Sequence, residues 1–201
     1  GAEIIHWSER DGWGHYYLFD GDGKLKNQIT SGEWVTGSSL HVDEKTRTLY
    51  FLGQGREAGE DPYYTHVYRV GLDGTGLKNL GPGNASHAAA MADQGRYFVD
   101  TASTVGSAPV SVLYDAAGVK VMDLEKADLT RLTEAGYKFP EAFQVKADDG
   151  ITDIYGVMYK PFDFDPARKY PIIAYVYPGP QTESVTKTFT PRSPNTALAQ
   201  M

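Results

Sequence analysis

Four short segments with strand-like composition follow one another between residues 39 and 80. They are Ser39-Leu-His-Val-Asp43, Thr48-Leu-Tyr-Phe-Leu52, Thr65-His-Val-Tyr-Arg-Val70 and Leu77-Lys-Asn-Leu80. Alternation of apolar and polar residues is typical of strands, and Gly and Asp residues mark the turns between them. The stretch therefore predicts one antiparallel sheet of four short strands.

The same pattern occurs in two further copies, one on each side of this stretch. The downstream copy is Ser86-His-Ala-Ala-Ala-Met91, Arg96-Tyr-Phe-Val-Asp100, Val110-Ser-Val-Leu-Tyr114 and Val119-Lys-Val-Met122. The upstream copy lacks its first strand and consists of Glu3-Ile-Ile-His-Trp7, His15-Tyr-Tyr-Leu-Phe19 and Leu25-Lys-Asn-Gln-Ile29. Turns of similar composition recur at the same places in each copy, which indicates a structural repeat.

A repeat of roughly 45 residues with four strands has the size of one β-propeller blade. Because such a blade cannot cover its own apolar faces, it depends on neighbours stacked around an axis. We therefore expect residues 1–125 to form a partial β-propeller of about two and a half blades, with further blades upstream. A small β-sandwich, which also uses short alternating strands, is the alternative.

The pattern changes after residue 125. Leu129, Leu132 and Ala135 fall on one face of a short helix, and Gly136 is placed to end it. We interpret residues 126–139 as a linker between two domains.

Residues 140–201 predict the start of an α/β-hydrolase domain. Two strands, Glu141–Lys146 and Thr152–Tyr159, precede the apolar run Ile172-Ile-Ala-Tyr-Val176. A continuous apolar run predicts a strand buried on both faces in a parallel sheet, and it ends at Tyr177 before a Pro178-Gly-Pro180 turn. Ligands gather at the carboxyl ends of such strands, so the Tyr177 hydroxyl is a candidate for stabilising an anion. From the residues alone, a packing role at the strand end is the other interpretation.

Composition excludes several classes of function. The 201 residues are 41% hydrophobic and 22% charged, as in globular proteins, and the net charge of -7 argues against a nucleic-acid partner. No apolar run is long enough to span a membrane, and the first residues do not resemble a signal peptide. The absence of cysteine excludes disulfides and leaves the compartment open, with a bacterial periplasm favoured over eukaryotic secretion.

The sequence predicts neither a metal site nor a cofactor. The five histidines, His6, His15, His41, His66 and His87, are scattered singly and are expected on strand faces or in turns. Asp20-Gly-Asp-Gly23 lacks the later ligands of a calcium loop and is expected to be a hairpin turn. A polar loop is expected from Gln54 to Asp61, because its glycines have the wrong spacing for a dinucleotide-binding motif.

Several of these segments together resemble the dipeptidyl peptidase IV branch of the prolyl oligopeptidase family. They are Ser8-Glu-Arg-Asp-Gly-Trp13, Phe98-Val-Asp-Thr-Ala-Ser103, Asp149-Gly150, Lys169-Tyr-Pro171 and Val176-Tyr-Pro-Gly-Pro180. The resemblance spans essentially the whole chain, and Pro178 departs from it where many members carry Gly or Ala.

The resemblance implies a serine peptidase that releases dipeptides from peptide amino termini, preferring Pro or Ala at the second position. It also implies that Tyr177 donates its hydroxyl to the oxyanion of the tetrahedral intermediate. The catalytic Ser, Asp and His are expected beyond Met201, and the Glu pair that binds the substrate's amino terminus before Gly1. We therefore expect this segment to be inactive alone, and the parent enzyme to be a homodimer, as family members commonly are.

Two alternative functions stay open. One is an endo-acting oligopeptidase or acylaminoacyl peptidase of the same architecture. The other is a propeller that binds peptides beside a degenerate, non-catalytic hydrolase domain.

Overall fold

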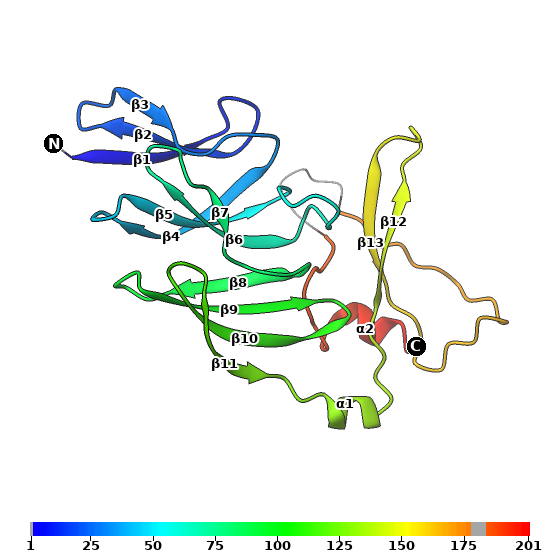
Figure 1. Ribbon diagram of the computed structural model, residues 1–201. Helices are drawn as coiled ribbons and strands as arrows, with labels where there is room; N and C mark the ends of the chain where they lie inside the picture. Colours follow the sequence, from blue (N-terminus) through cyan, green and yellow to red (C-terminus); the bar gives the residue numbers. More distant parts are fainter. Residues whose placement is uncertain (1, 178–183) are drawn as a thin grey trace. The chain divides into compact units, whose positions relative to one another are not determined.

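The computed structural model describes residues 2–177 and 184–201 and is mainly β (Figure 1). The chain divides into two compact units. One comprises Gly1–Ala102 and Val110–Glu125, and the other comprises Ser103–Pro109 and Lys126–Met201.

The first sheet has three strands, in the order β1-β2-β3. They are β1 (Glu3–Ser8), β2 (His15–Asp20) and β3 (Leu25–Gln28), all antiparallel to their neighbours. The turn after β2 is closed by the Asp20 carboxylate, which accepts hydrogen bonds from the backbone N–H groups of Asp22 and Lys24 at 3.0 and 2.9 Å. This confirms a hairpin turn at the position that superficially matches a calcium loop.

Two sheets of four strands follow. The second sheet has the order β4-β5-β6-β7, and its strands are β4 (Val35–Asp43), β5 (Thr48–Gln54), β6 (Thr65–Gly71) and β7 (Lys78–Asn79). The third sheet has the order β11-β10-β9-β8, and its strands are β8 (Ser86–Met91), β9 (Tyr97–Thr104), β10 (Ser107–Asp115) and β11 (Lys120–Lys126).

These three sheets confirm the repeat predicted from the sequence. Each strand overlaps the segment expected for it, and the upstream copy has three strands rather than four. Three strands are longer than predicted: β4 begins at Val35 instead of Ser39, β9 ends at Thr104 instead of Asp100, and β11 ends at Lys126 instead of Met122. The pairing of β4 with β5 changes register around Ser39. This irregularity interrupts the alternation of apolar and polar residues along β4, so the sequence pattern did not show that the strand begins at Val35.

Two hydrophobic cores lie between successive sheets. The first combines Tyr16 and Leu18 of β2 with Phe51 of β5 and Tyr68 of β6. The second combines Tyr50 and Val67 of the second sheet and Leu80, which follows β7, with Phe98, Val112 and Tyr114 of the third sheet. The second sheet is therefore covered on both faces, as expected for a blade between two others.

The second unit contains both helices and a separate hairpin. Its elements are α1 (Thr130–Glu134), β12 (Glu141–Lys146), β13 (Asp153–Met158) and α2 (Pro194–Leu198). α1 confirms the predicted short helix, and β12 pairs with β13 as predicted. Neither helix is long enough to cross a membrane, and no other helix occurs in the described ranges.

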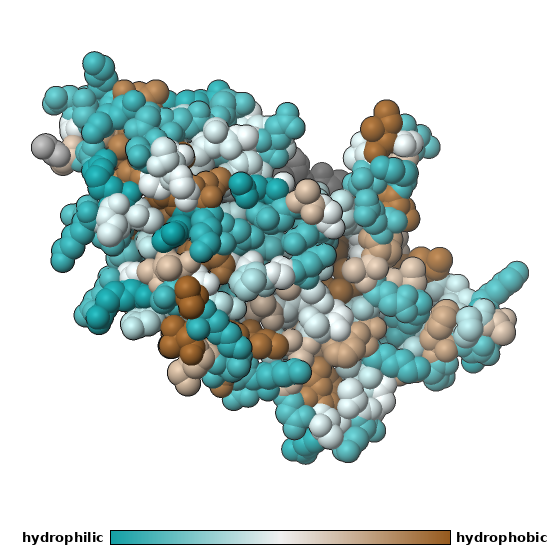
Figure 2. Space-filling model, viewed as in Figure 1, coloured by the Kyte–Doolittle hydropathy of each residue, from teal (hydrophilic) through white to brown (hydrophobic). Residues whose placement is uncertain are grey.

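Aromatic rings form the packed centre of the second unit. The ring of Tyr137 makes edge contacts with Phe139, Phe162 and Phe189, at centroid distances of 5.5, 5.6 and 6.3 Å. The hairpin β12–β13, by contrast, keeps apolar side chains exposed, and brown atoms mark its tip in Figure 2. Four of them are Phe143, Val145, Ile151 and Ile154.

The predicted buried strand ending at Tyr177 is wrong for the described residues. Residues 171–177 have no regular secondary structure, and Ile172 is 93% exposed. A parallel strand forms only beside partner strands, and no strand within residues 2–177 or 184–201 pairs with this segment. The predicted Pro178-Gly-Pro180 turn lies outside the described residues.

Candidate functional site

Tyr177 is the residue that the sequence singles out for chemistry. It lies in the irregular segment 171–177, and its side chain is 55% exposed. More than half of this residue is therefore accessible to solvent. The sheet edge that was expected to fix the direction of this hydroxyl is absent from the described residues.

A serine peptidase requires a serine hydroxyl hydrogen-bonded to a histidine. In the described part of the chain, histidine ring nitrogens contact only other groups, those of Thr30, Gly32, Glu60, Gly83 and Asp100. His15 Nδ1 lies 3.1 Å from the Thr30 hydroxyl, but His15 is completely buried and cannot meet a substrate. The described residues therefore contain no serine–histidine pair.

All five histidines lie on strands, as expected: His6 on β1, His15 on β2, His41 on β4, His66 on β6 and His87 on β8. No three histidine, aspartate or glutamate side chains of the described residues come close enough together to hold a metal ion.

The partners of His15 fix its tautomer. Its Nε2–H donates to the Gly32 carbonyl oxygen at 2.9 Å, and Nδ1 is left to accept from Thr30.

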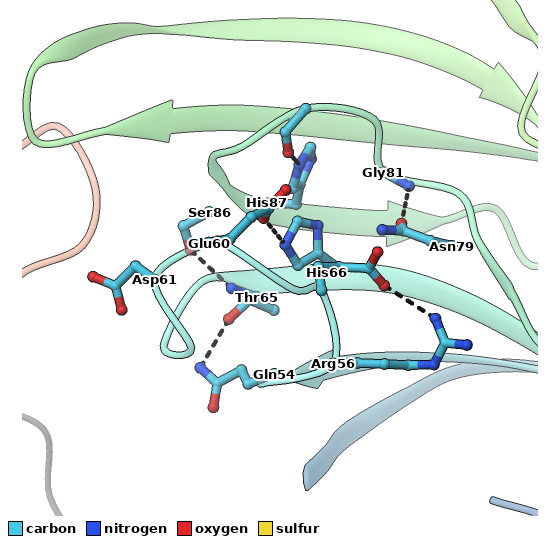
Figure 3. Close-up of polar contacts among 12 residues, drawn as sticks. Gln54, Arg56, Glu60, Asp61, Thr65, His66, Asn79, Gly81, Ser86 and His87 are labelled. Carbon is cyan, nitrogen blue, oxygen red and sulfur yellow. Dashed lines mark hydrogen bonds and ion pairs between the residues drawn. The ribbon is translucent and has the colours of Figure 1, made fainter. Parts of the chain in front are cut away.

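A group of polar contacts surrounds the loop between β5 and β6 (Figure 3). Two carboxylates of this loop contact side chains of β6. Glu57 Oε1 accepts from the Tyr68 hydroxyl at 2.9 Å, and Glu60 Oε2 lies 2.9 Å from His66 Nε2. His66 and Tyr68 are two residues apart on a strand, so they point to the same face, and the loop folds back over that face.

His66 also links two sheets. Its ring centroid lies 5.1 Å from that of His87 on β8, whose Nδ1 donates to Asp100 of β9 at 2.7 Å. Beside this contact, the Thr65 backbone N–H donates to the Ser86 hydroxyl at 3.4 Å, as Figure 3 shows. The polar chain Glu60–His66–His87–Asp100 thus runs from the loop through one sheet into the next.

Two groups of this cluster have shifted pKa values. Burial, followed by the hydrogen bond to the Glu57 carboxylate, raises the pKa of Tyr68 well above its ordinary value. Partial burial opposes ionisation of Glu57, but hydrogen bonds from Tyr68 and Arg56 outweigh it and hold the pKa of Glu57 below its ordinary value. Glu57 is therefore an ionised acceptor and Tyr68 a neutral donor, which matches the observed contact.

A second charged group is centred on the first strand. Glu3 of β1 forms ion pairs with Arg47, at 2.7 Å, and with Lys26. Hydrogen bonds from Arg47 and Lys26 lower the pKa of Glu3 to about 2. These residues line an open hollow of about 730 Å³ together with Ala2, Asp20, Gly21 and Asp22.

Sequence reasoning missed the roles of Glu57 and Glu60. It placed a polar loop at Gln54–Asp61, and the structure confirms a loop there, between the end of β5 and the start of β6. The available signal was the presence of two rings with hydrogen-bonding groups, His66 and Tyr68, two residues apart on a strand that also carries the apolar residues Val67 and Val70. Such groups need partners when buried, and the preceding acidic loop is the nearest source of acceptors.

Comparison with known proteins gives a consistent result. The family model described as the dipeptidyl peptidase IV N-terminal region matches residues 1–109. Human dipeptidyl peptidase 8 is 31% identical over 173 residues, which cover 80% of this chain and 19% of that protein. The probable dipeptidyl-aminopeptidase B of Neosartorya fischeri is 33% identical over 196 residues, which cover 90% of this chain and 20% of that protein.

A solved structure agrees with these matches. The crystal structure of Porphyromonas gingivalis dipeptidyl peptidase 4 superposes with a TM-score of 0.77 at 26% identity. The superposition covers 94% of this chain and 26% of that one. The chain therefore spans about a fifth to a quarter of the length of the proteins that it matches.

Proposed function

The chain belongs to the dipeptidyl peptidase IV family, and from this premise we propose that the protein containing it is a serine peptidase that removes dipeptides from peptide amino termini. The proposed substrates carry Pro or Ala at the second position, and the reaction passes through an acyl-enzyme. The observation that carries the proposal is the family match over residues 1–109, joined to the Val176-Tyr-Pro segment of the following unit.

Residues 1–125 are proposed to be the last blades of the propeller, 126–139 a linker, and 140–201 the start of the catalytic domain. Three observations support this assignment. The three sheets precede residue 127, the first compact unit ends at Glu125 although Ser103–Pro109 group with the second, and an antiparallel hairpin follows the short helix α1.

Within that enzyme, we assign Tyr177 the role of a donor to the oxyanion. A hydroxyl aimed at the position where negative charge develops contributes about 10²–10³ in rate. The exposure of the Tyr177 side chain supports the assignment, because a donor to substrate has to be accessible. In the complete sheet, pairing of residues 169–177 with neighbouring strands would fix the backbone that carries this side chain.

The present chain is proposed to be inactive alone. Acyl transfer needs a nucleophile and a base in contact, and the described residues bring no serine hydroxyl to a histidine ring. The partner implied by this function is a peptide.

The test compares chromogenic substrates with free and blocked amino termini. The full-length protein should cleave Gly-Pro and Gly-Ala substrates, lose that activity when the amino terminus is acetylated, and be inactivated by a fluorophosphonate. The 201-residue chain should show no turnover. Cleavage of blocked peptides would instead support an endopeptidase or acylaminoacyl peptidase. Failure of the full-length protein to react with the fluorophosphonate would support a non-catalytic peptide-binding propeller.

A further inference from the structure

We propose that residues 55–64, between β5 and β6, form a hinged flap that is held closed by two side-chain latches, Glu57–Tyr68 and Glu60–His66. This flap opens as a local unit while the sheets beneath it stay folded. The inference concerns the propeller alone and does not depend on the proposed peptidase activity.

The flap lies outside the hydrophobic cores of the first unit. None of its residues is buried, and neither hydrophobic core of the first unit includes a flap residue. Segments with few buried apolar contacts open at a free-energy cost far below that of global unfolding. The flap is therefore held mainly by polar contacts.

The backbone provides points about which the flap can turn. Gly55 and Gly59 both have a φ of 80°, a conformation that residues with a side chain rarely adopt. Between Asp61 and Tyr64 the flap is braced by its own turn, because the Tyr64 N–H donates to the Asp61 carbonyl oxygen at 3.0 Å. The mobile part is thus expected to be the segment that carries the two latching carboxylates.

Both latches join the flap to buried side chains of β6. Tyr68 is completely buried and His66 is nearly so, and each gives its hydrogen bond to a flap carboxylate. Arg56 adds a cation over the Tyr68 ring, with its guanidinium carbon 5.8 Å from the ring centroid. A hydrogen bond to an ionised acceptor is stronger than one between neutral groups, so loss of both should shift the flap strongly toward the open state.

An open flap would uncover the junction between two blades. His66 lies between the Glu60 carboxylate and the ring of His87, which belongs to the next sheet (Figure 3). His66 Nδ1 is buried and has no hydrogen-bond partner in the described residues. Opening would give this nitrogen access to water, which partly offsets the loss of the latch.

The experiment is limited trypsin digestion of the full-length protein at neutral pH, followed at the Arg56–Glu57 bond by mass spectrometry. The double variant Tyr68→Phe/Glu60→Gln removes the Tyr68 donor of one latch and the negative charge of the Glu60 acceptor in the other, and it leaves residues 54–59 unchanged. We expect cleavage after Arg56 to accelerate about tenfold or more, because proteolysis follows the population of the open form. The variant Tyr97→Phe/Glu44→Gln, which changes two exposed residues of the same types, should be cleaved at the wild-type rate.

Cleavage after Arg96, in the turn between β8 and β9, reports on general loosening and should stay unchanged in the double variant. If the double variant does not fold, the single variant Glu60→Gln provides the same test with a smaller acceleration. Equal rates of cleavage after Arg56 in wild type and latch variants would overturn the proposal. So would a wild-type rate as high as that of a synthetic peptide covering the flap.

Discussion

Leu49 and Tyr50 are consecutive residues of β5, and their side chains enter different hydrophobic cores. Successive side chains of a strand point to opposite faces, so β5 supplies the first core through Leu49 and Phe51 and the second through Tyr50. β5 thus contributes to the packing of all three sheets. Substitutions in it should therefore lower the stability of the whole first unit.

We predict that Leu49→Ala lowers the free energy of unfolding by about 2–5 kcal/mol, because it removes a completely buried side chain and leaves a cavity. Thermal or urea unfolding followed by circular dichroism measures the effect. Ile172→Ala is the control, since Ile172 is 93% exposed and should change stability little. Similar losses in both variants would show that the core assignment is wrong.

Gly53→Ala is predicted to destabilise the protein through overpacking. A Cβ atom at Gly53 would lie 2.9 Å from the Trp34 ring and 3.1 Å from the Tyr68 ring, and both rings are packed in the first core. The expected cost is about 1–3 kcal/mol in an unfolding titration. Gly106→Ala provides the comparison, because the Thr104 hydroxyl oxygen, at 4.0 Å, is the nearest described atom to its Cβ position apart from the adjacent residues. An unchanged unfolding midpoint for Gly53→Ala would contradict the packing described here.

The ion pairs of Glu3 predict a specific pH dependence. Its pKa falls from 4.5 to about 2 on folding, so its contribution is fully present above pH 4.5 and is lost as the pH falls through about 2. The difference in melting temperature between wild type and Glu3→Gln should therefore be largest near neutral pH and shrink in acid. High salt should reduce it as well, because the group is exposed. A difference that does not vary with pH would exclude Glu3 as its source, and Glu44→Gln serves as the control.

Tyr177→Phe in the full-length protein tests the proposed oxyanion donor. The change removes one hydroxyl and little volume, so kcat on a Gly-Pro substrate should fall about 10²–10³-fold while KM changes little. Tyr175→Phe, which changes a neighbouring exposed phenol, should leave both constants near wild type. A rise in KM without loss of kcat would mean that the Tyr177 hydroxyl binds the ground state.

The strands of the propeller repeat could be predicted because the residue pattern along the chain and the packing between sheets favour the same structure. Strands such as β6 alternate apolar and polar residues, and turns such as Asp20-Gly-Asp-Gly23 use residues with the required backbone conformations. The helix α2 was missed, although Ser193 caps it by accepting from the Asn195 N–H at 3.2 Å and Pro194 occupies its first turn. Five residues are too few for a clear periodic pattern.

The candidate site was harder to predict for two physical reasons. The composition of residues 169–177 indicates a strand, but a strand needs hydrogen-bonding neighbours, and a single segment does not reveal whether they are present. The contacts of Glu57 and Glu60 depend on how an irregular loop folds back over β6, and this is decided by tertiary partners rather than by spacing along the chain. Tyr177 remains a prediction from family resemblance.

The placement of alternate β5 side chains on opposite sides also constrains how this sequence can change its length. Deleting one residue within β5 would exchange the two sets of side chains, sending Tyr50 toward the space of Leu49 and Phe51. The segment between Gly55 and Tyr64 contains no buried residue, so insertions there would displace no residue of either hydrophobic core. Homologous proteins should therefore vary in length at this loop while keeping the number of residues in the preceding strand constant.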